Sequence, residues 1–376
     1  MRTTSLRALA GVVAVLAVTG VAIVATRSAT AAGPCDASVV PPSGTSGDLL
    51  LAVTGAPGRS VAVGIHFDGG TGRPLVLHAV DGQWQRVMIP IRNGAGTIQL
   101  QDAVTDGERT WAVGVLRNQV PMAGWLHGDR WRWSTPVDPG GMEDELMGVA
   151  IADDGTVWAV GKHQRGHDYQ PLVERFDGHS WTIVPNPVVP GSAVLRDIAR
   201  AHDGTMWAVG WSVRDGGDTS PLIERWDGSA WAVVKDSGPG LLSGIAVDTD
   251  GTATAVGWQT TPVAVVPVAW SWNGSIWGPM SPPAPSGRLT SVIDDGDSVV
   301  AVGSSNDASG IPVPLLVRRT GSTWTSIAPN AHPALPPPDP GGDVLAGVTG
   351  STNAFLAVGT RDTPDAFGSL VVSGGC

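Results

Sequence analysis

The chain has 376 residues, of which 34 are acidic and 23 basic, and it contains 51 Gly, 30 Pro and 16 Trp. The low share of charged residues, 15%, and the many helix breakers exclude a coiled coil, a helical solenoid and a long-helix protein. A formal charge of -11 argues against nucleic-acid binding, which needs a basic surface. The two Cys exclude a disulfide-dense scaffold and a Cys-ligated zinc site.

Residues 1–32 have the pattern of a secretory signal peptide. Arg2 and Arg7 precede an uncharged apolar run over residues 8–25, and small residues at 29–32 provide a cleavage site. The pattern predicts a secreted, extracellular protein without a membrane segment after cleavage. An uncleaved leader would instead anchor the protein, because the apolar run is nearly long enough to span a bilayer.

Residues 33–376 are predicted to form a single domain, because one sequence unit recurs in them seven times. A tetrapeptide ending in Val-Gly marks each unit, with its glycine at Gly64, Gly114, Gly161, Gly210, Gly257, Gly303 and Gly359. A second marker is a tryptophan with the same period, at Trp84, Trp131, Trp181, Trp231, Trp277 and Trp324. Two independent markers with one period indicate a repeat architecture.

Within one unit the signals are those of four short strands. Residues 146–151, 156–161, 172–176 and 181–184 are rich in apolar, β-branched and aromatic residues without helical periodicity. Asp-Gly turns follow the first and third strands, and a polar loop follows the second. Four antiparallel strands per unit, repeated radially, describe a β-propeller. We therefore predict an all-β, seven-bladed β-propeller with blades at about 48–93, 97–138, 143–189, 192–236, 239–283, 286–330, and 343–376 plus 35–42.

The ends of the chain predict how the ring closes. The seventh unit stops after three strands, and residues 35–42 resemble an orphan fourth strand. An N-terminal strand would therefore complete the last blade. Cys35 and Cys376 would then lie where other blades have an Asp-Gly turn, and we predict a disulfide bond between them.

The repeated Trp and Gly residues have a structural interpretation. One Trp per unit predicts packing between neighbouring sheets, and the Val-Gly glycines predict a close approach of the backbones of neighbouring blades. Trp211 and Trp258 differ, because they directly follow the Val-Gly marker at the edge of a loop. We therefore include both among the residues that could face a pocket.

The loops between second and third strands, and those between blades, emerge on one face of a propeller around the mouth of its channel. Here these loops are predicted to be long and polar. The candidate binding residues on them are His66, Asp68, Glu143, Asp144, His163, His167, Asp168, Tyr169, Trp211, Arg214, Asp215, Asp218, Trp258, Asp307 and Asp362. Such a face fits a cation, a glycan or a basic peptide, or a solvated rim without a ligand.

No cofactor and no metal site are predicted. His163 and His167 are four residues apart on a Gly-containing loop rather than on a helix, which argues against zinc. Calcium bound by Asp carboxylates and loop carbonyls is chemically easier, but no EF-hand-like spacing is present.

The repeat resembles a known group of propellers. Trp158-Ala159-Val160-Gly161 and the hairpin from Trp226 to Trp231 are similar to the "WAVG" strand and "W-D-G-x-x-W" hairpin of secreted actinobacterial and myxobacterial propellers, often described as kelch-like or galactose-oxidase-like. The resemblance covers all seven units and implies the fold. It implies no galactose-oxidase chemistry, because that chemistry needs a Tyr–Cys cross-link and copper ligands, whereas this chain has one Tyr and only terminal Cys.

Two functional classes follow from the sequence. The first is a secreted, monomeric, non-catalytic binding or scaffold module, extracellular or associated with the cell wall, whose glycan or protein ligand binds at the loop face. It is favoured because no nucleophile–base pair and no metal constellation is apparent. The second is a carbohydrate-active hydrolase or lyase that uses carboxylates at the channel mouth.

Overall fold

The computed structural model describes residues 36–39, 46–56, 58–91, 96–117, 119–214, 217–281, 284–296, 298–327, 342–362 and 367–375. These residues form 28 strands, arranged as seven antiparallel sheets of four strands, and no helix. None of them therefore belongs to a helix that could span a membrane. The predicted all-β, seven-bladed propeller is confirmed, whereas the predicted leader, residues 1–32, lies outside the described residues.

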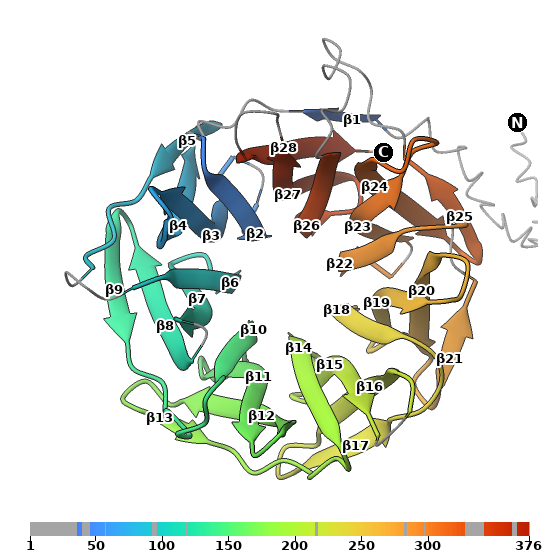
Figure 1. Cartoon of the computed structure of the whole chain (residues 1–376), viewed down its shortest axis with the longest axis horizontal. Helices are drawn as coiled ribbons and strands as arrows, with labels where there is room; N and C mark the ends of the chain where they lie inside the picture. The colour runs from blue at the N-terminus through green and yellow to red at the C-terminus, as the bar shows by residue number, and fades with distance from the viewer. Residues whose placement is uncertain are drawn as a thin grey trace, which may run out of the picture. The chain divides into compact units, whose positions relative to one another are not determined.

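Each blade runs outward from the centre of the ring (Figure 1). The first, innermost strands are β2 (Asp48–Thr54), β6 (Ile98–Thr105), β10 (Glu145–Ile151), β14 (Ser192–Arg200), β18 (Leu241–Val247), β22 (Arg288–Asp294) and β26 (Gly342–Ser351). The second strands are β3 (Val61–Asp68), β7 (Arg109–Leu116), β11 (Val157–Arg165), β15 (Met206–Val213), β19 (Ala253–Thr260), β23 (Ser298–Asn306) and β27 (Ala354–Asp362).

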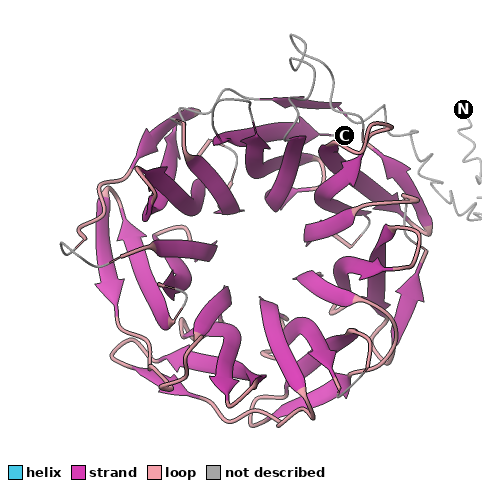
Figure 2. Ribbon diagram, in the orientation of Figure 1, coloured by secondary structure: helices cyan, strands magenta, loops and turns pink. Residues whose placement is uncertain are grey.

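The outer half of each blade is formed by its third and fourth strands (Figure 2). The third strands are β4 (Thr71–Val80), β8 (Val120–His127), β12 (Asp168–Phe176), β16 (Ser220–Trp226), β20 (Val265–Trp272), β24 (Pro312–Thr320) and β28 (Phe367–Gly375). The fourth strands are β5 (Gln83–Arg86), β9 (Arg130–Ser134), β13 (Trp181–Ile183), β17 (Trp231–Lys235), β21 (Trp277–Met280), β25 (Thr323–Ser326) and, in the seventh blade, β1 (Asp36–Val39).

The N-terminal strand β1 completes the seventh blade, as predicted. It pairs antiparallel with β28, with Ala37 opposite Gly374 and Val39 opposite Val372. Ala37 is buried in the same apolar cluster as Leu370. Cys35 and Cys376, the residues next to these two strands in sequence, lie outside the described residues, so their disulfide bond stays a prediction.

Every first strand contains a β-bulge after a buried Leu. In the first blade Leu50 pairs with Gly64 and Ala52 pairs with Val63, so residue 51 is the extra one. The equivalent bulges follow Leu100, Leu146, Leu195, Leu242, Leu289 and Leu345. The bulge presses the backbone of the first strand onto the second, so a Cβ at Gly64 would clash with the carbonyl oxygen of Leu49.

This contact corrects the predicted role of the Val-Gly glycines. At all seven of them, an added Cβ would meet a first-strand carbonyl of the same blade, not the backbone of a neighbouring blade. The close approach between blades occurs instead at the residue directly after each bulge, which we call the inner position. The inner positions are Ala52, Asp102, Gly148, Asp197, Gly244, Ser291 and Gly347.

Neighbouring blades pack tightly at these inner positions. An added Cβ at Gly148 would lie 2.7 Å from the Cα of Asp197 in the next blade, and one at Gly347 would lie 2.9 Å from the Cα of Ala52. A side chain at either glycine would therefore push the blades apart.

Aromatic side chains fill the space between blades farther from the centre. Trp158, on the second strand of the third blade, packs against Trp226 and Trp231 of the fourth, with ring centroids 5.0 and 6.0 Å apart. Trp111 contacts Phe176 and Trp181 one interface earlier, and Trp207 contacts Trp272 and Trp277 one interface later. The predicted role of the repeated Trp in inter-sheet packing is confirmed at these three interfaces.

Truncation of Trp158 should therefore loosen the contact between the third and fourth blades. Trp158 is 3% exposed. A Trp→Ala substitution at such a buried site lowers the free energy of unfolding by about 3–5 kcal/mol. We expect Trp158→Ala to lower the free energy of unfolding by that amount in urea denaturation. Ile276→Ala, at a side chain that is 65% exposed, is the control and should change it by less than about 0.5 kcal/mol. Equal effects of the two variants would contradict the packing role.

Two buried glutamates occupy equivalent places on the third strands of the third and fourth blades. Glu174 and Glu224 are both fully buried. The Oε2 atom of Glu174 accepts a hydrogen bond of 2.8 Å from the backbone of Val137, whereas Pro187, at the equivalent place in the next repeat, has no N–H to offer Glu224. Burial raises the pKa of Glu174 to about 7 and that of Glu224 to about 8, although the Asn186 amide opposes the second shift.

These shifts predict that the propeller loses stability as the pH rises. Between the ordinary glutamate pKa, 4.5, and about 8, the folded state holds a proton on Glu224 that the unfolded state releases. The stabilisation is complete below pH 4.5 and is lost as the pH rises to about 8. In the wild type the unfolding free energy should decrease with rising pH in this window, and in Glu224→Gln this decrease should be smaller by up to about 1.4 kcal/mol per pH unit. Urea denaturation from pH 5 to about 8 measures the difference. The matched control is Glu108→Gln, at a side chain 73% exposed, and an unchanged slope in Glu224→Gln would contradict the prediction.

Candidate functional site

The hairpins between second and third strands are tighter than the sequence predicts in two of the blades. In the third blade, β11 extends to Arg165 and β12 begins at Asp168, so only Gly166 and His167 form the turn. In the first blade, Asp68 pairs with Thr71 across Gly69 and Gly70. The prediction of long polar loops is wrong there. Polar side chains at the end of a hairpin can face water on both sides of the strand, so polarity does not mark the end of the pairing.

Several candidate residues on this face are engaged in internal contacts. Asp48, buried at the start of β2, accepts two hydrogen bonds of 2.7 and 2.8 Å from Arg86 and lies 2.6 Å from Nδ1 of His66. Asp144 is also fully buried and accepts backbone hydrogen bonds from Gly141 at 2.7 Å and Gln164 at 3.0 Å. These carboxylates hold the start of a first strand in place.

Glu143 and Tyr169 form the most connected polar cluster on the face. The Tyr169 hydroxyl donates to Oε2 of Glu143 at 2.5 Å, and the Nζ atom of Lys162 lies 3.4 Å from the same oxygen. Lys162 also lies 4.4 Å from the centre of the Tyr169 ring and 3.7 Å from Glu145. The Tyr169 hydrogen bond lowers the pKa of Glu143 and raises that of Tyr169. The cluster links the third blade internally and satisfies its own charges.

The remaining candidates are distributed around the rim. Asp168 accepts a hydrogen bond of 3.0 Å from Ser192, and Arg214 forms an ion pair with Asp236. Asp307 caps its own loop by accepting from the N–H groups of residues 309 and 311. His163 lies 3.9 Å from Asp144, His167, Asp68 and Asp218 are exposed, and Trp211 and Asp362 are half-buried. Asp215 lies outside the described residues.

Metal ligation finds no support in the described part of the chain. No group of three or more His, Cys, Asp or Glu side chains in it is arranged to hold a metal ion. Calcium binding stays untested.

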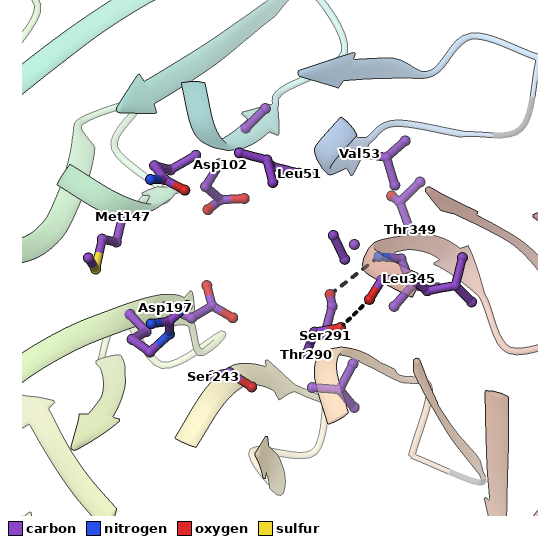
Figure 3. Close-up of a pocket in the computed structure, with 18 of the residues that line it drawn as sticks. Leu51, Val53, Asp102, Met147, Asp197, Ser243, Thr290, Ser291, Leu345 and Thr349 are labelled. Carbon is purple, nitrogen blue, oxygen red and sulfur yellow. Dashed lines mark hydrogen bonds between the residues drawn. The ribbon is translucent and has the colours of Figure 1, made fainter. Parts of the chain in front are cut away.

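A cavity of about 700 Å³ lies inside the ring and is lined by residues of all seven first strands (Figure 3). Trp258 and Ser304, from second strands, complete its wall. Among the fifteen candidates drawn from the sequence, Trp258 alone contributes to this wall within the described residues. A volume of this size is typical of ligand pockets. We call this cavity the channel.

Two aspartates project into the channel from inner positions (Figure 3). The Oδ2 atom of Asp102 accepts a hydrogen bond of 2.9 Å from the backbone of Val149, and Oδ2 of Asp197 accepts one of 2.8 Å from Ile245. Each carboxyl therefore joins its blade to the next. Ser291 accepts from Val348 in the same way at 3.3 Å. Burial raises the pKa of both aspartates, and the charge of Asp197 raises that of Asp102 further.

Two arginines also line the channel. Arg196 is the bulge residue of β14, and Arg288 is the first residue of β22. The guanidinium carbon of Arg288 lies 5.5 Å from the ring centre of Trp258. A channel with an aromatic face, two guanidinium groups and carboxyl groups of raised pKa can bind a polar ligand by stacking and by charge-assisted hydrogen bonds.

Sequence reasoning missed Asp102, Asp197, Arg196 and Arg288. The signal that could have found the first three is a charged residue within two positions after the Leu of a first strand, as in Leu195-Arg196-Asp197. Such a residue must face either a cavity or a buried partner.

The fold and the channel define this protein as a seven-bladed β-propeller with a polar central channel. No model of a known protein family matches the chain, and no curated protein matches its sequence. A structure of YCF48 bound to a D1 peptide aligns with a TM-score of 0.58 at 13% identity, over 92% of this chain and 97% of that one. An ulvan lyase of polysaccharide lyase family PL25 aligns with a TM-score of 0.58 at 11% identity, over 88% and 95%. Both comparisons support the fold alone.

The hydrogen bonds that Asp197 accepts predict a structural cost for its removal. Asp197→Ala would leave the N–H groups of Ile198 and Ile245, which donate to it at 2.7 and 2.8 Å, without their acceptor. We expect a loss of about 1–3 kcal/mol in unfolding free energy, measured by urea denaturation. Asp197→Asn keeps one acceptor oxygen in place of two, so it can satisfy only one of these N–H groups and should lose less than Asp197→Ala but more than nothing. Equal losses in both variants would contradict this account.

Proposed function

We propose that this protein is a secreted, non-catalytic binding module that takes a glycan or a protein segment at the loop face, with the channel as its binding site. The observation that carries the proposal is the channel of about 700 Å³, whose wall combines Trp258 with two arginines and two aspartates. The rim residues, in contrast, are exposed or bonded to one another. The glycan or protein segment therefore lies across the loop face, and one of its sugar rings or side chains enters the channel.

The two neighbours in fold are consistent with such a role. One is a propeller bound to a peptide, and the other is a polysaccharide lyase. The proposal takes from them only that a ring of this kind can present a surface to an extended polymer.

A carbohydrate-active hydrolase or lyase is the second candidate. The observation that favours it is the pKa of Asp102, raised to about 8, since a general acid needs a carboxyl group that is protonated near neutral pH. Against it, each Oδ2 atom already accepts a backbone hydrogen bond from the next blade. A carboxyl group held in this way contributes to the structure of the ring, which argues against a catalytic role.

Substitution of Trp258 tests the binding site. We expect the purified protein to bind members of a glycan array or a peptide array, and Trp258→Leu to weaken that binding at least tenfold, because the aromatic face of the channel is lost. Affinities measured by calorimetry on the best ligand give the comparison.

The matched control is Trp211→Leu, the same substitution at the equivalent place of the preceding blade. Trp211 does not contribute to the channel wall as described, so its variant should bind like the wild type. Loss of binding in Trp211→Leu but not in Trp258→Leu would place the site on the rim. Cleavage of a bound glycan, detected by mass spectrometry and lost in Asp102→Asn, would favour the hydrolase or lyase.

A further inference from the structure

Arg196, on the channel wall, has a buried N–H group without a partner among the described residues. Its Nε atom is buried and makes no hydrogen bond, and the described residues provide no ion pair for its guanidinium group. Glu145 and Asp197 act on it only at longer range, and Glu145 is already bonded to Gln101 at 2.5 Å. Buried polar groups without partners are rare in folded proteins, and a buried guanidinium is among the most costly.

Arg288 is a second guanidinium on the same wall. It is exposed, and its contact in the described part of the chain is with the ring of Trp258. Because a cation over an aromatic ring keeps its N–H donors at the edge of the guanidinium plane, Arg288 can hold Trp258 and still bind an anion. Arg196 and Arg288 come from two different blades, so their donors reach the channel from separate directions.

The acidic groups of the channel cancel these charges only in part. Burial raises the pKa of Asp102 to about 8, so this carboxyl group is mostly uncharged at neutral pH, whereas Asp197, with a pKa of about 6, is mostly charged. Burial also raises the pKa of Glu145. Glu145 is further compensated by Lys162 at 3.7 Å. In a chain of formal charge -11, the two guanidinium groups of the channel wall thus face one carboxyl group, Asp197, that is mostly charged at neutral pH, which leaves a positive excess.

We propose that the channel recognises an acidic oligosaccharide, whose anionic group is bound by Arg196 and Arg288 while one sugar ring packs on Trp258. The inference rests on the proposed binding function and names the chemistry of its ligand. Guanidinium groups bind a sugar carboxylate or sulfate through paired N–H donors, and Gln99 and Gln101 on the same wall supply amides for sugar hydroxyls. A flat apolar face beside polar groups fits a sugar ring better than an apolar peptide side chain.

Binding of three trisaccharides tests the ligand class by calorimetry. The probes are a trigalacturonate, a sulfated galactotriose and the neutral galactotriose. We expect the neutral trimer to bind at least tenfold more weakly than the better of the two anionic trimers, whose ranking tells carboxylate from sulfate. Arg196→Gln and Arg288→Gln should each weaken anionic binding by about 10- to 100-fold, the loss of one or more charge-assisted hydrogen bonds. Arg130→Gln, at an exposed residue on β9, is the matched control and should bind like the wild type.

The outcomes separate this inference from the function on which it rests. Equal binding of neutral and anionic trimers, or wild-type affinity in both Arg variants, would overturn the acidic ligand and leave glycan binding intact. Binding of an acidic peptide in place of every glycan would overturn it in favour of a protein ligand. Absence of all binding would overturn the inference together with the proposed function.

A measurement of thermal stability distinguishes a variant that loses binding from one that fails to fold. If Arg196 is retained for a ligand, its removal should relieve the unpaired buried charge, because such residues are kept at the expense of stability. Arg196→Met keeps the apolar stem and should raise Tm by about 2–4 °C while abolishing preference for the anionic trimers. A lower Tm with unchanged preference would show that Arg196 is structural, and would overturn its role in binding.

Discussion

The bulge of each first strand against the glycine of the second strand is the constraint on which the ring depends. It places one extra residue, such as Leu51 in the first blade, at the edge of the channel and turns the next residue toward the neighbouring blade. Gly64 and its equivalents are required because the bulged backbone occupies the place of a Cβ. The Val-Gly marker in the sequence and the geometry of the first strands at the centre thus result from the same contact, which occurs in all seven blades.

The inner positions show how hydrogen bonds between neighbouring blades are arranged in a ring with an odd number of blades. From the second blade to the seventh, a polar residue alternates with glycine, and each polar side chain accepts a hydrogen bond from the blade after it. Strict alternation cannot continue around seven blades. The first blade interrupts it with Ala52, whose side chain is small enough to meet Gly347 and has no acceptor to offer the second blade.

The sequence predicts the fold well and the site poorly. Period, strand signals and the missing fourth strand of the last blade suffice for the ring, because each depends on local backbone preferences repeated many times. The sequence does not predict the role of the Val-Gly glycines, because a bulge has no distinct sequence signal in a single strand. Asp102 and Arg196 cannot be placed at the channel from one strand, because only the ring brings the first strands together. The position of Trp258 interrupts the repeat, which is a signal that the sequence does contain.

The difference between contacts within one blade and contacts between blades explains why the channel, rather than the rim, provides polar groups for a ligand. Rim groups such as Asp144 and Tyr169 have partners within their own blade, so sequence repetition is enough to satisfy them. Channel groups must be satisfied across blades, and Asp102 and Asp197 achieve this with the backbone of the next blade. Arg196 has only donors, and its Nε atom finds no acceptor among the described residues. The ring thus places on the channel wall a donor group whose environment no single repeat contains.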